Sequence, residues 1–471
     1  MTTAPRGRFT GTLWLRGDDG FEEAAAGRVF NARQPDRRPA AVLHAATYDD
    51  VIAGVRVARE RGWQVAPRSG AHSWAAWGLR DDALLLDTHL LKTIEFDAAT
   101  GIATVDAGVI GGEELAPFLT ARDRMFHGGH CPSVGVAGFL LQGGQGWCAR
   151  GWGWAAEAVV AIDVVTAAGE LVRADADQNS DLHWAARGAG PGFFGVVTRF
   201  HLRTRPKPKA MLQTVYAFPV AEFDAVLGWL YATHGTVDTD VELVALSLTP
   251  PPPMGIEGHE HVLLVGALAF KDSAADAQQA LAPIDACPVS DRALFAVHAA
   301  PTSLAEQYQE QYRQNPTGHR YTVDNAWIDA DAETAIPLLR DAFLTWPTRQ
   351  SFTLWFSMAP LRPLPDMAFS LQTEVYLAAY TVAAVEADDP VCRGWVDEQF
   401  GQLQPVTAGQ YLGDSDLSHR QVRFLSDENY ARLQRIRADR DPDRLFVDYL
   451  TSDPATLNTN AWLAGDAGGT Q

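Results

Sequence analysis

Cysteine is scarce in this chain, and long hydrophobic runs are missing from it. Four cysteines, at positions 131, 148, 287 and 392, are spread over 471 residues without a CxxC pair. This spacing argues against a disulfide framework and against a structural zinc site. No stretch of about 18 apolar residues occurs, and the N-terminus lacks the apolar run of a secretory signal. The sequence therefore predicts a cytoplasmic protein with no membrane partner.

Positive charge is also in short supply. The chain has 38 lysines and arginines against 58 aspartates and glutamates, which gives a formal net charge of −20. A surface of this sign repels nucleic acid, so we expect no nucleic-acid partner. Hydrophobic residues make up 47% and charged residues 20% of the chain, which excludes disorder as the main state. At this length, two or three domains are expected.

Several catalytic signatures are absent from the sequence. It contains no GxxxxGK[ST] phosphate loop, no GxSxG nucleophile elbow, no HExxH metal motif and no GxGxxG after a predicted strand. His127, His130 and Cys131 lie close together in the sequence. Three ligands crowded into five residues of a glycine-rich loop make poor tetrahedral geometry, so we predict no metal site.

Short helical and strand patterns alternate along the chain. Residues 48–62 are typical of a capped amphipathic helix that ends at Gly62. Short strands are expected at 63–66, 83–87, 102–107 and 159–165. The basic, proline-rich segment 203–209 predicts a domain boundary. After it we expect a sheet with helices on one face, with helices at 220–233, 273–283, 331–346 and 390–402, and strands at 211–218, 261–270, 321–328, 351–358 and 369–382.

Glycine, in contrast, is abundant between residues 128 and 154, where it occurs nine times. That density does not suit a regular helix, because each interior glycine costs roughly 1 kcal/mol. It suits a backbone that must pass close to something flat or anionic. A set of ordinary turns would have the same composition.

Two nucleophilic side chains lie in loops of small residues. His72 belongs to Arg68-Ser69-Gly70-Ala71-His72-Ser73, and Cys131 to Gly129-His130-Cys131-Pro132-Ser133-Val134-Gly135. Taken alone, they could be a loop histidine and a small buried hydrophobic residue. Together the loops resemble the R-S-G-G-H-S and G-x-C-x-x-V-G motifs of the berberine-bridge-enzyme-like branch of the vanillyl-alcohol-oxidase flavoproteins. The resemblance continues through 138–146, 164–170, 181–188, 194–198, 429–433 and 441–446.

The resemblance implies bicovalent FAD, bonded through His72 to the flavin 8α-methyl and through Cys131 to flavin C6. Imidazole and thiolate are nucleophiles that an electron-poor flavin ring can accept. Glycines let backbone N–H groups approach a pyrophosphate. The cofactor-binding residues implied are His72, Cys131, Arg68, Ser69, Gly70, Ala71, Ser73, Ser133, Val134, Gly135, Gly138, Gly143, Gly144, Gly146, Val196 and Tyr411.

The resemblance also implies the fold class. We expect an α+β, two-domain FAD-binding fold of the vanillyl-alcohol-oxidase type. Residues 1–205 would form the FAD-binding domain, and residues 206–410 a substrate-binding domain with a helix-covered antiparallel sheet. Residues 411–471 would return to the FAD domain.

The substrate side departs from the family pattern. The family's Y-x-N-[YF]-x-D signature becomes Tyr411-Leu412-Gly413-Asp414-Ser415-Asp416. In relatives the second aromatic is often a tyrosine placed near the flavin, which sometimes acts as the base. We therefore predict Asp414 as the base or a substrate anchor here, with an ordinary loop aspartate as the alternative. Strand 369–382 would turn Glu374 and Tyr376 toward the flavin or toward solvent, and Tyr321 alternates similarly on another strand. Tyr376, Glu374 and Tyr321 are therefore competing catalytic candidates.

The reaction implied by the resemblance is a two-electron oxidation by an FAD-linked oxidase. A base takes a hydroxyl or amine proton while hydride passes to flavin N5 from an alcohol, hemiacetal or amine carbon of a bulky small molecule. Molecular oxygen becomes hydrogen peroxide, an acceptor favoured by Val134, where family oxidases carry valine. A dehydrogenase with another acceptor and a flavin-carrying binding protein remain alternatives. The sequence predicts neither the oligomeric state nor whether the substrate is a carbohydrate or a polycyclic natural product.

Overall fold

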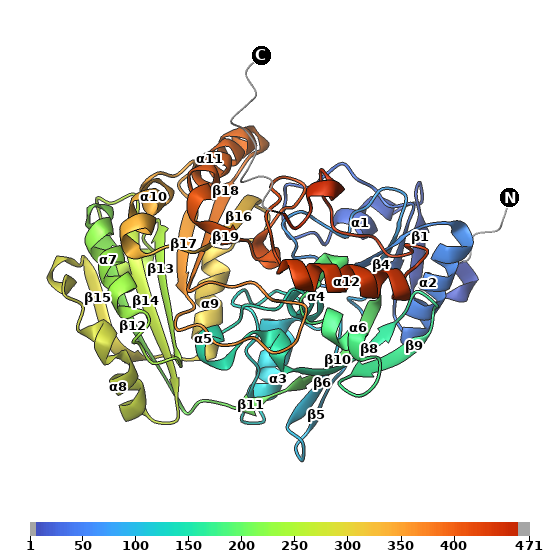
Figure 1. Cartoon of the computed structure of the whole chain (residues 1–471), viewed down its shortest axis with the longest axis horizontal. Coiled ribbons are helices and arrows are strands. Elements are labelled where there is room, and N and C mark those ends of the chain that lie inside the picture. The colour runs from blue at the N-terminus through green and yellow to red at the C-terminus, as the bar shows by residue number, and fades with distance from the viewer. Residues whose placement is uncertain (1–5, 460–471) are drawn as a thin grey trace.

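The computed structural model describes residues 6–459, and four β-sheets lie within this range (Figure 1). The predicted N-terminal domain and C-terminal segment also include residues 1–5 and 460–471, which lie outside the described residues. No helix between residues 6 and 459 combines the length and the apolar character needed to cross a bilayer.

A small mixed sheet begins the chain. Its strand order is β1-β2-β4-β3, with β2 and β3 both parallel to β4, and its strands are β1 (Thr12–Leu15), β2 (Ala41–His44), β3 (Val65–Arg68) and β4 (Leu84–Asp87). Helix α1 (Phe21–Ala26) and helix α2 (Tyr48–Arg61) accompany it. Thr47 caps α2 by accepting from the Asp50 amide, and Gly62 ends it with a φ of 68°. The predicted helix and the two nearby strands are confirmed to within two residues.

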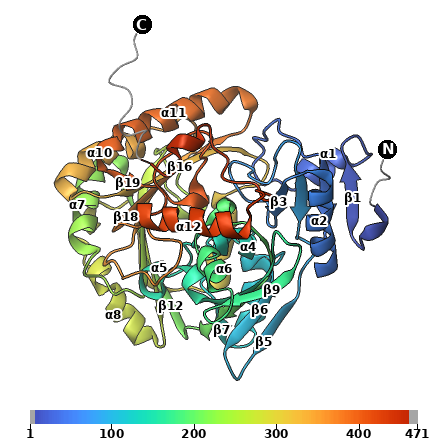
Figure 2. The ribbon, with the colours of Figure 1, turned by 45° about the vertical axis from the view of Figure 1, so that its right-hand side comes forward.

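A second, antiparallel sheet completes the N-terminal half. Its order is β5-β6-β10-β8-β9, with β5 (Ile94–Asp97), β6 (Ile102–Asp106), β8 (Val159–Val165), β9 (Leu171–Asp175) and β10 (Val196–Arg203). The C-terminal helix α12 (Asp427–Arg440) lies beside α6 (Ser180–Ala185) in two views (Figures 1 and 2). Leu433 of α12 belongs to the same hydrophobic core as Phe200 and Ile162. Helix α12 is therefore packed into the first half of the molecule.

An eight-stranded antiparallel sheet fills the other half of the molecule. Its order is β15-β12-β14-β13-β17-β18-β16-β19. The strands are β12 (Ala210–Pro219), β13 (Val241–Leu248), β14 (Val262–Lys271), β15 (Phe295–Pro301), β16 (Arg320–Ile328), β17 (Phe352–Ser357), β18 (Val375–Ala383) and β19 (Thr407–Gly409). One face is covered by α7 (Phe223–Thr233), α8 (Ala274–Asp285), α10 (Ala332–Leu344) and α11 (Asp389–Gln402) (Figure 1). The predicted α+β class with a helix-covered antiparallel sheet is confirmed.

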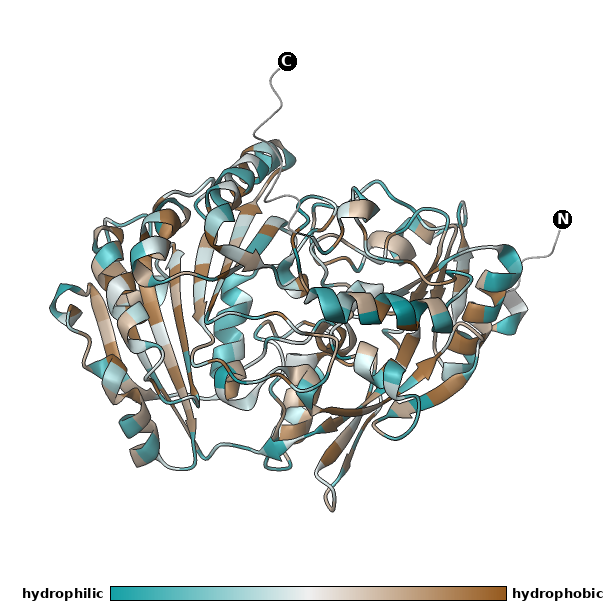
Figure 3. Ribbon diagram, in the orientation of Figure 1, coloured by the Kyte–Doolittle hydropathy of each residue, from teal (hydrophilic) through white to brown (hydrophobic). Residues whose placement is uncertain are grey.

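The opposite face of this sheet looks toward the N-terminal half. Leu243 and Ala245 of β13 pack under the covering helices, whereas Glu242, Val244 and Leu246 lie on the inner face. Helix α9 (Leu304–Gln314) lies on the inner side as well (Figure 1). Figure 3 shows the strands as largely hydrophobic and α9 as largely hydrophilic. The inner face of the sheet is thus positioned to form one wall of a site between the two halves.

The remaining elements are short. Helix α3 (Ala116–Thr120) and the two-residue strands β7 (Arg124–Met125) and β11 (Arg205–Pro206) join the halves. The glycine-rich segment contains two short helices, α4 (Val136–Leu141) and α5 (Ala149–Trp152), although its composition argued against a regular helix. Each helix is only one or two turns long, which limits the free-energy cost of placing glycine in it.

One predicted strand was wrong in its first half. The structure has β18 beginning at Val375, and residues 369–374 are irregular. The Phe369 amide donates to the Arg187 carbonyl, and the Gln372 side chain accepts from Trp154 Nε1 at 2.8 Å. These residues therefore bond to loops of the N-terminal half, so their polar groups do not continue the sheet. The other predicted strands and helices of the large sheet lie within three residues of their expected bounds.

Candidate cofactor and substrate site

A cavity of about 710 Å³ lies between the two halves, a size typical of small-molecule sites. One side is formed by loops of the N-terminal half, including 67–74, 129–131 and 134–135. The other side is the inner face of the large sheet. Its rim includes Gln307, Glu310, Gln311 and Gln314, which share one face of α9.

The loop after β3 is anchored by a buried arginine. Arg68 Nε lies 2.6 Å from Asp87 Oδ2, and its guanidinium also donates to the Ala24 carbonyl. Burial lowers the pKa of Arg68, while Asp87 opposes that shift. Ser69 Oγ donates to the Ala107 carbonyl at 2.5 Å. These anchors fix the start of the loop and leave residues 70–73 along the cavity.

His72 and Cys131 converge at the wall of the cavity. His72 Nε2 lies 2.9 Å from Ser133 Oγ and 3.9 Å from Cys131 Sγ. The His72 ring stacks on Phe30 with centroids 3.9 Å apart. Burial lowers the pKa of His72 to about 4 and raises the pKa of the Cys131 thiol. The imidazole is therefore neutral and nucleophilic at neutral pH.

Asp414 is the centre of a second polar cluster. Trp74 Nε1 donates to Asp414 Oδ1 at 3.0 Å, and the Tyr376 hydroxyl donates to Asp414 Oδ2 at 2.6 Å. Burial and the Asp414 carboxylate raise the pKa of Tyr376 well above its ordinary value, and they do the same for Tyr380. Both phenols are thus held protonated, as donors. All four side chains line the cavity.

The backbone before Asp414 is fixed by a buried amide. Asn325 of β16 donates through Nδ2 to the Tyr411 carbonyl at 2.9 Å and accepts from the Tyr411 amide at 2.6 Å. The Tyr411 hydroxyl accepts from the amides of Gly144 and Gln145, both at 3.2 Å. Burial raises the pKa of Tyr411. Tyr411 therefore joins the large sheet to the glycine-rich segment.

Two of the competing catalytic candidates lie away from the cavity. Glu374 is exposed, because it precedes β18 instead of lying on it. The Tyr321 hydroxyl donates to the Pro316 carbonyl at 2.6 Å, and the residue is fully buried outside the cavity lining. The structure thus brings Asp414 and Tyr376 together and leaves Glu374 and Tyr321 apart from them.

Most of the expected cofactor residues line the cavity, but three glycines do not. Those on the wall are Arg68, Ser69, Gly70, Ala71, His72, Ser73, Cys131, Val134, Gly135, Gly138, Val196 and Tyr411. Ser133 reaches it through its bond to His72. Gly143, Gly144 and Gly146 serve packing instead: a Cβ at Gly146 would lie 2.2 Å from the His127 carbonyl oxygen, and one at Gly143 2.8 Å from the Phe369 ring.

Three polar residues of the cavity wall, Trp74, His130 and Glu242, had not been predicted to belong to the site. Trp74 holds Asp414, and His130 pairs with Glu242, with Nε2 and Oε1 3.0 Å apart. His130 had been considered only as a metal ligand. A signal for Glu242 exists in the sequence, because it is the one charged residue in the apolar run 241–248.

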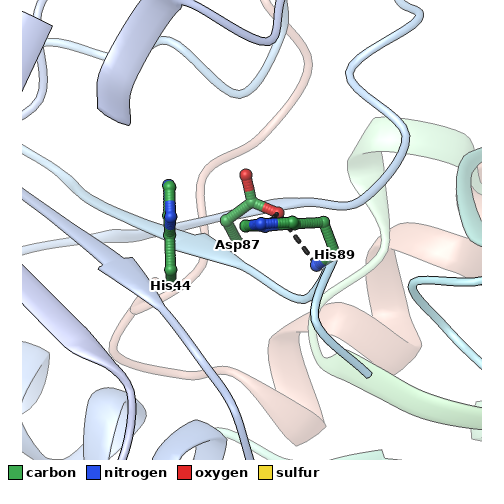
Figure 4. A group of neighbouring side chains, drawn as sticks. All are labelled: His44, Asp87 and His89. Atoms are coloured by element: carbon green, nitrogen blue, oxygen red, sulfur yellow. Dashed lines mark hydrogen bonds and ion pairs between the residues drawn. The ribbon is translucent and has the colours of Figure 1, made fainter. Parts of the chain in front are cut away.

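His44, Asp87 and His89 form the one group of potential metal ligands found among residues 6–459 (Figure 4). Asp87 Oδ1 lies 2.9 Å from His89 Nδ1, while Oδ2 pairs with both Arg68 and Arg28 at 2.6 Å. Burial would raise the pKa of Asp87, but the His89 bond and the two guanidinium charges hold it well below its ordinary value. Two guanidinium groups on the same carboxylate oppose a cation, so we interpret the group as the support of Arg68.

Comparison with known proteins gives the family. A model of the FAD binding domain matches residues 39–175. An FAD-linked oxidoreductase of Penicillium janthinellum is 33% identical over 430 residues, covering 89% of this chain and 93% of the relative. The chain belongs to the FAD-linked oxidoreductases. FAD-dependent oxidation is therefore its general chemistry.

Solved structures share the fold of this FAD-linked oxidoreductase. The 6-hydroxy-D-nicotine oxidase of Arthrobacter nicotinovorans superposes with a TM-score of 0.81 at 20% identity, over 96% of this chain and 100% of that one. Phl p 4 superposes with a TM-score of 0.78 at 16% identity, over 93% of this chain and 96% of that one. Its wild type is described as a glucose dehydrogenase and an isoleucine-to-valine variant as a glucose oxidase.

The first loop of this oxidoreductase fits the pyrophosphate of FAD. Among residues 6–459, no acceptor is found for the backbone N–H groups of residues 70–73. Such a run of free amides forms an anion-binding concavity. A Cβ at Gly70 would lie 2.6 Å from the Gly135 amide nitrogen, so glycine lets the His72 and Cys131 loops touch. The residues present therefore suit a flavin dinucleotide.

Ala71 replaces the second glycine of the family's R-S-G-G-H-S motif and has a φ of +57°. This left-handed conformation is unfavourable for alanine by roughly 1–2 kcal/mol, part of which glycine would lose again through its greater freedom when unfolded. We predict that Ala71→Gly raises the midpoint of thermal unfolding by roughly 1–3 °C. The control is Ala75→Gly, at a buried position without a positive φ, which should lower it. A lower midpoint of thermal unfolding in Ala71→Gly would contradict the inference that the backbone of Ala71 is strained.

Proposed function

We propose that this protein is an FAD-dependent oxidase with bicovalently attached FAD. The observation that carries the proposal is the convergence of His72 Nε2 and Cys131 Sγ, 3.9 Å apart, on one cavity wall from loops 59 residues apart in sequence. Residues 1–205 and the segment from 411 onward would hold FAD, and residues 206–410 the substrate. When bound, FAD supplies the two-electron acceptor of the oxidation and passes the electrons to molecular oxygen, which becomes hydrogen peroxide.

The two nucleophiles start from different protonation states. His72 is neutral, so its ring nitrogen has a lone pair for a carbon–nitrogen bond, and Cys131 would form a carbon–sulfur bond after losing its thiol proton. Each bond replaces one hydrogen on the flavin carbon and one on the side chain. Each therefore releases two electrons and two protons, which oxygen takes up as hydrogen peroxide. Ser133 contacts both side chains and orients them.

Asp414 is the proposed base for the substrate hydroxyl or amine. Trp74 and Tyr376 each donate to one carboxylate oxygen of Asp414, which fixes the orientation of the carboxylate. Tyr376 and Tyr380 are poor bases, because burial and Asp414 hold their protons. Tyr376, the other candidate that lines the cavity, is thus better suited to positioning Asp414 and the substrate oxygen.

The walls opposite the His72 loop favour an apolar substrate. Strands β12, β13, β14, β15, β17 and β18 all contribute residues to the cavity wall. Most of these residues are aliphatic or aromatic, including Val215, Val244, Leu246, Leu264, Val297 and Phe356. A carbohydrate site would need polar groups for many hydroxyls, and unpaired substrate hydroxyls are costly in such surroundings. We therefore favour an aromatic or polycyclic molecule with an alcohol or amine carbon over a sugar.

Oxygen is the proposed acceptor because Val134 lines the cavity three residues after Cys131. We predict that Val134→Ile slows flavin reoxidation by oxygen and leaves anaerobic reduction by substrate nearly unchanged, as measured by stopped-flow absorbance. Val215→Ile adds the same methylene on the sheet side of the cavity and should leave reoxidation unchanged. If both half-reactions slow equally in Val134→Ile, the residue acts only in packing.

Anaerobic reduction followed by air tests the proposal as a whole. Substrates would first be found by screening alcohols and amines for peroxide release. Fast reoxidation after anaerobic bleaching would support an oxidase, and slow reoxidation a dehydrogenase with another acceptor. A flavin that no tested compound reduces would favour a binding protein without turnover.

A further inference from the structure

A histidine–carboxylate pair stands in the cavity and takes no part in the chemistry proposed above. His130 Nε2 lies 3.0 Å from Glu242 Oε1, and Glu242 Oε2 accepts from the Cys148 amide at 2.9 Å. The Glu242 side chain is 7% exposed and that of His130 is 24% exposed. Both residues line the cavity. Each carboxylate oxygen of Glu242 thus has a partner within the protein, while the imidazole of His130 remains partly exposed to the cavity.

The bond to Glu242 determines which atom of His130 is available to a ligand. With Nε2–H donated to Glu242, Nδ1 of His130 is left as an acceptor. Among residues 6–459, no side chain or backbone group bonds to that atom. The ring is seated between Trp147 and Phe356, with centroids 4.4 and 5.9 Å away. The position of the acceptor is therefore fixed before a ligand arrives.

The strand register gives the distance between Glu242 and Tyr376, the residue that donates to Asp414. Val244 of β13 is opposite Phe356 of β17, which is opposite Tyr376 of β18. Glu242 lies two residues from Val244 on the same face. Strand spacings of about 4.8 Å and a rise of about 3.3 Å per residue place the Cα atoms of Glu242 and Tyr376 roughly 12 Å apart.

The floor of the cavity between Glu242 and Tyr376 is apolar. It contains Val244 and Phe356, and the neighbouring position on β14 is Gly266, which leaves room above the sheet. A Cβ at Gly266 would meet only ordinary contacts, the nearest being Val244 Cγ2 at 3.4 Å. A flat, apolar skeleton fits such a floor, and its ends would meet polar groups.

We propose that His130, held by Glu242, binds a second hydroxyl or amine of the substrate. The substrate would be a rigid, largely apolar fused-ring molecule with polar groups at both ends, one at Asp414 and the other at Nδ1 of His130. This inference rests on the proposed function for the assignment of the Asp414 end. His130 is a specificity-determining residue in this account, and Glu242 is its positioning residue.

The test measures binding without turnover. The probes are three rigid steroids: androstane-3β,17β-diol, androstan-3β-ol and androstan-17β-ol. Their dissociation constants are measured anaerobically on the holoenzyme by quenching of tryptophan fluorescence, since Trp147 adjoins His130. We expect the wild type to bind the diol about tenfold or more tightly than either mono-alcohol, the effect of one good hydrogen bond.

Variants of the pair should remove that preference. His130→Phe keeps an aromatic ring without the acceptor, and Glu242→Gln keeps the shape without the carboxylate. Both should bring the ratio of diol to mono-alcohol binding close to one while the mono-alcohols bind as before. His130→Gln, which restores an acceptor, should recover part of the preference. Asp285→Asn, beside His298 in a pair outside the cavity, is the matched control and should change nothing.

The inference would be overturned by a wild type that binds the diol no more tightly than the mono-alcohols. It would also be overturned by pair variants that keep the preference while their flavin content and melting midpoint remain normal. Failure of the proposed function would look different, because the flavin would then stay oxidised with every substrate whatever the binding ratios are. The two results are therefore separable on the same preparations.

Discussion

Flavin should stay with this protein after precipitation in acid. If His72 and Cys131 each carry a bond to FAD, the washed pellet remains yellow, and the intact mass exceeds that of the chain by one FAD less two hydrogens per bond. His72→Ala and Cys131→Ala should each retain the flavin through the other bond. The double variant should lose all of it on denaturation, which is the largest change that we expect from any substitution.

The physical reason lies in the two loops that meet at Ser133. His72 is buried and neutral, and Cys131 Sγ lies 3.9 Å from its Nε2, so both nucleophiles address one end of the cavity. Cys148→Ala is the matched control, because Cys148 is fully buried in a hydrophobic cluster and does not line the cavity. That variant should keep both bonds. Flavin retained in the denatured double variant would show that other atoms carry the attachment, and a colourless wild-type pellet would exclude covalent flavin altogether.

Local patterns in the sequence predicted the elements that are stabilised locally. Helix α2 begins at its Thr47 cap and ends at Gly62, both of which are visible in the sequence. The loops of His72 and Cys131 were found through small residues and family motifs. Their mutual approach depends on a backbone contact between Gly70 and Gly135 that no local pattern encodes.

Features that depend on long-range register were harder to predict. Glu374 was considered for the cavity face because an alternating pattern was extended through residues 369–374, which are irregular in the structure. The Phe369 amide bonds to the Arg187 carbonyl of the other half, and the regular strand begins only at Val375. Glu242 was overlooked because strand β13 is apolar on both faces apart from this residue and Ser247. Its role becomes evident only in the folded protein, where His130, 112 residues away in the sequence, lies beside it.

The contact between Asp414 and Tyr376 also arises from tertiary structure. The two residues are 38 positions apart and belong to different elements. Asn325, on a third element, fixes the Tyr411 backbone and so determines where the short turn Leu412–Asp414 lies. The sequence could point to Asp414 by its place in a motif, but it could not show which donors hold the carboxylate.

Replacing Asp414 with asparagine should slow reduction of the flavin by substrate roughly 10²–10⁴-fold, the usual effect of removing a catalytic base. Asp414→Asn keeps the shape and an acceptor for Trp74 Nε1, but an amide cannot take the substrate proton. The measurement is the rate of anaerobic flavin bleaching in a stopped-flow instrument, on protein with wild-type flavin content. Tyr376→Phe removes only a donor to the carboxylate and should cost less.

Glu374→Gln is the matched control for Asp414→Asn. It makes the same change from carboxylate to amide at an exposed residue close to the N-terminal end of β18. Because Glu374 does not line the cavity, its rate of flavin reduction should equal that of the wild type. An unchanged rate in Asp414→Asn would rule Asp414 out as the base. His130 would then be the next candidate, since its Nδ1 is an acceptor open to the cavity and the bond to Glu242 fixes the orientation of its ring.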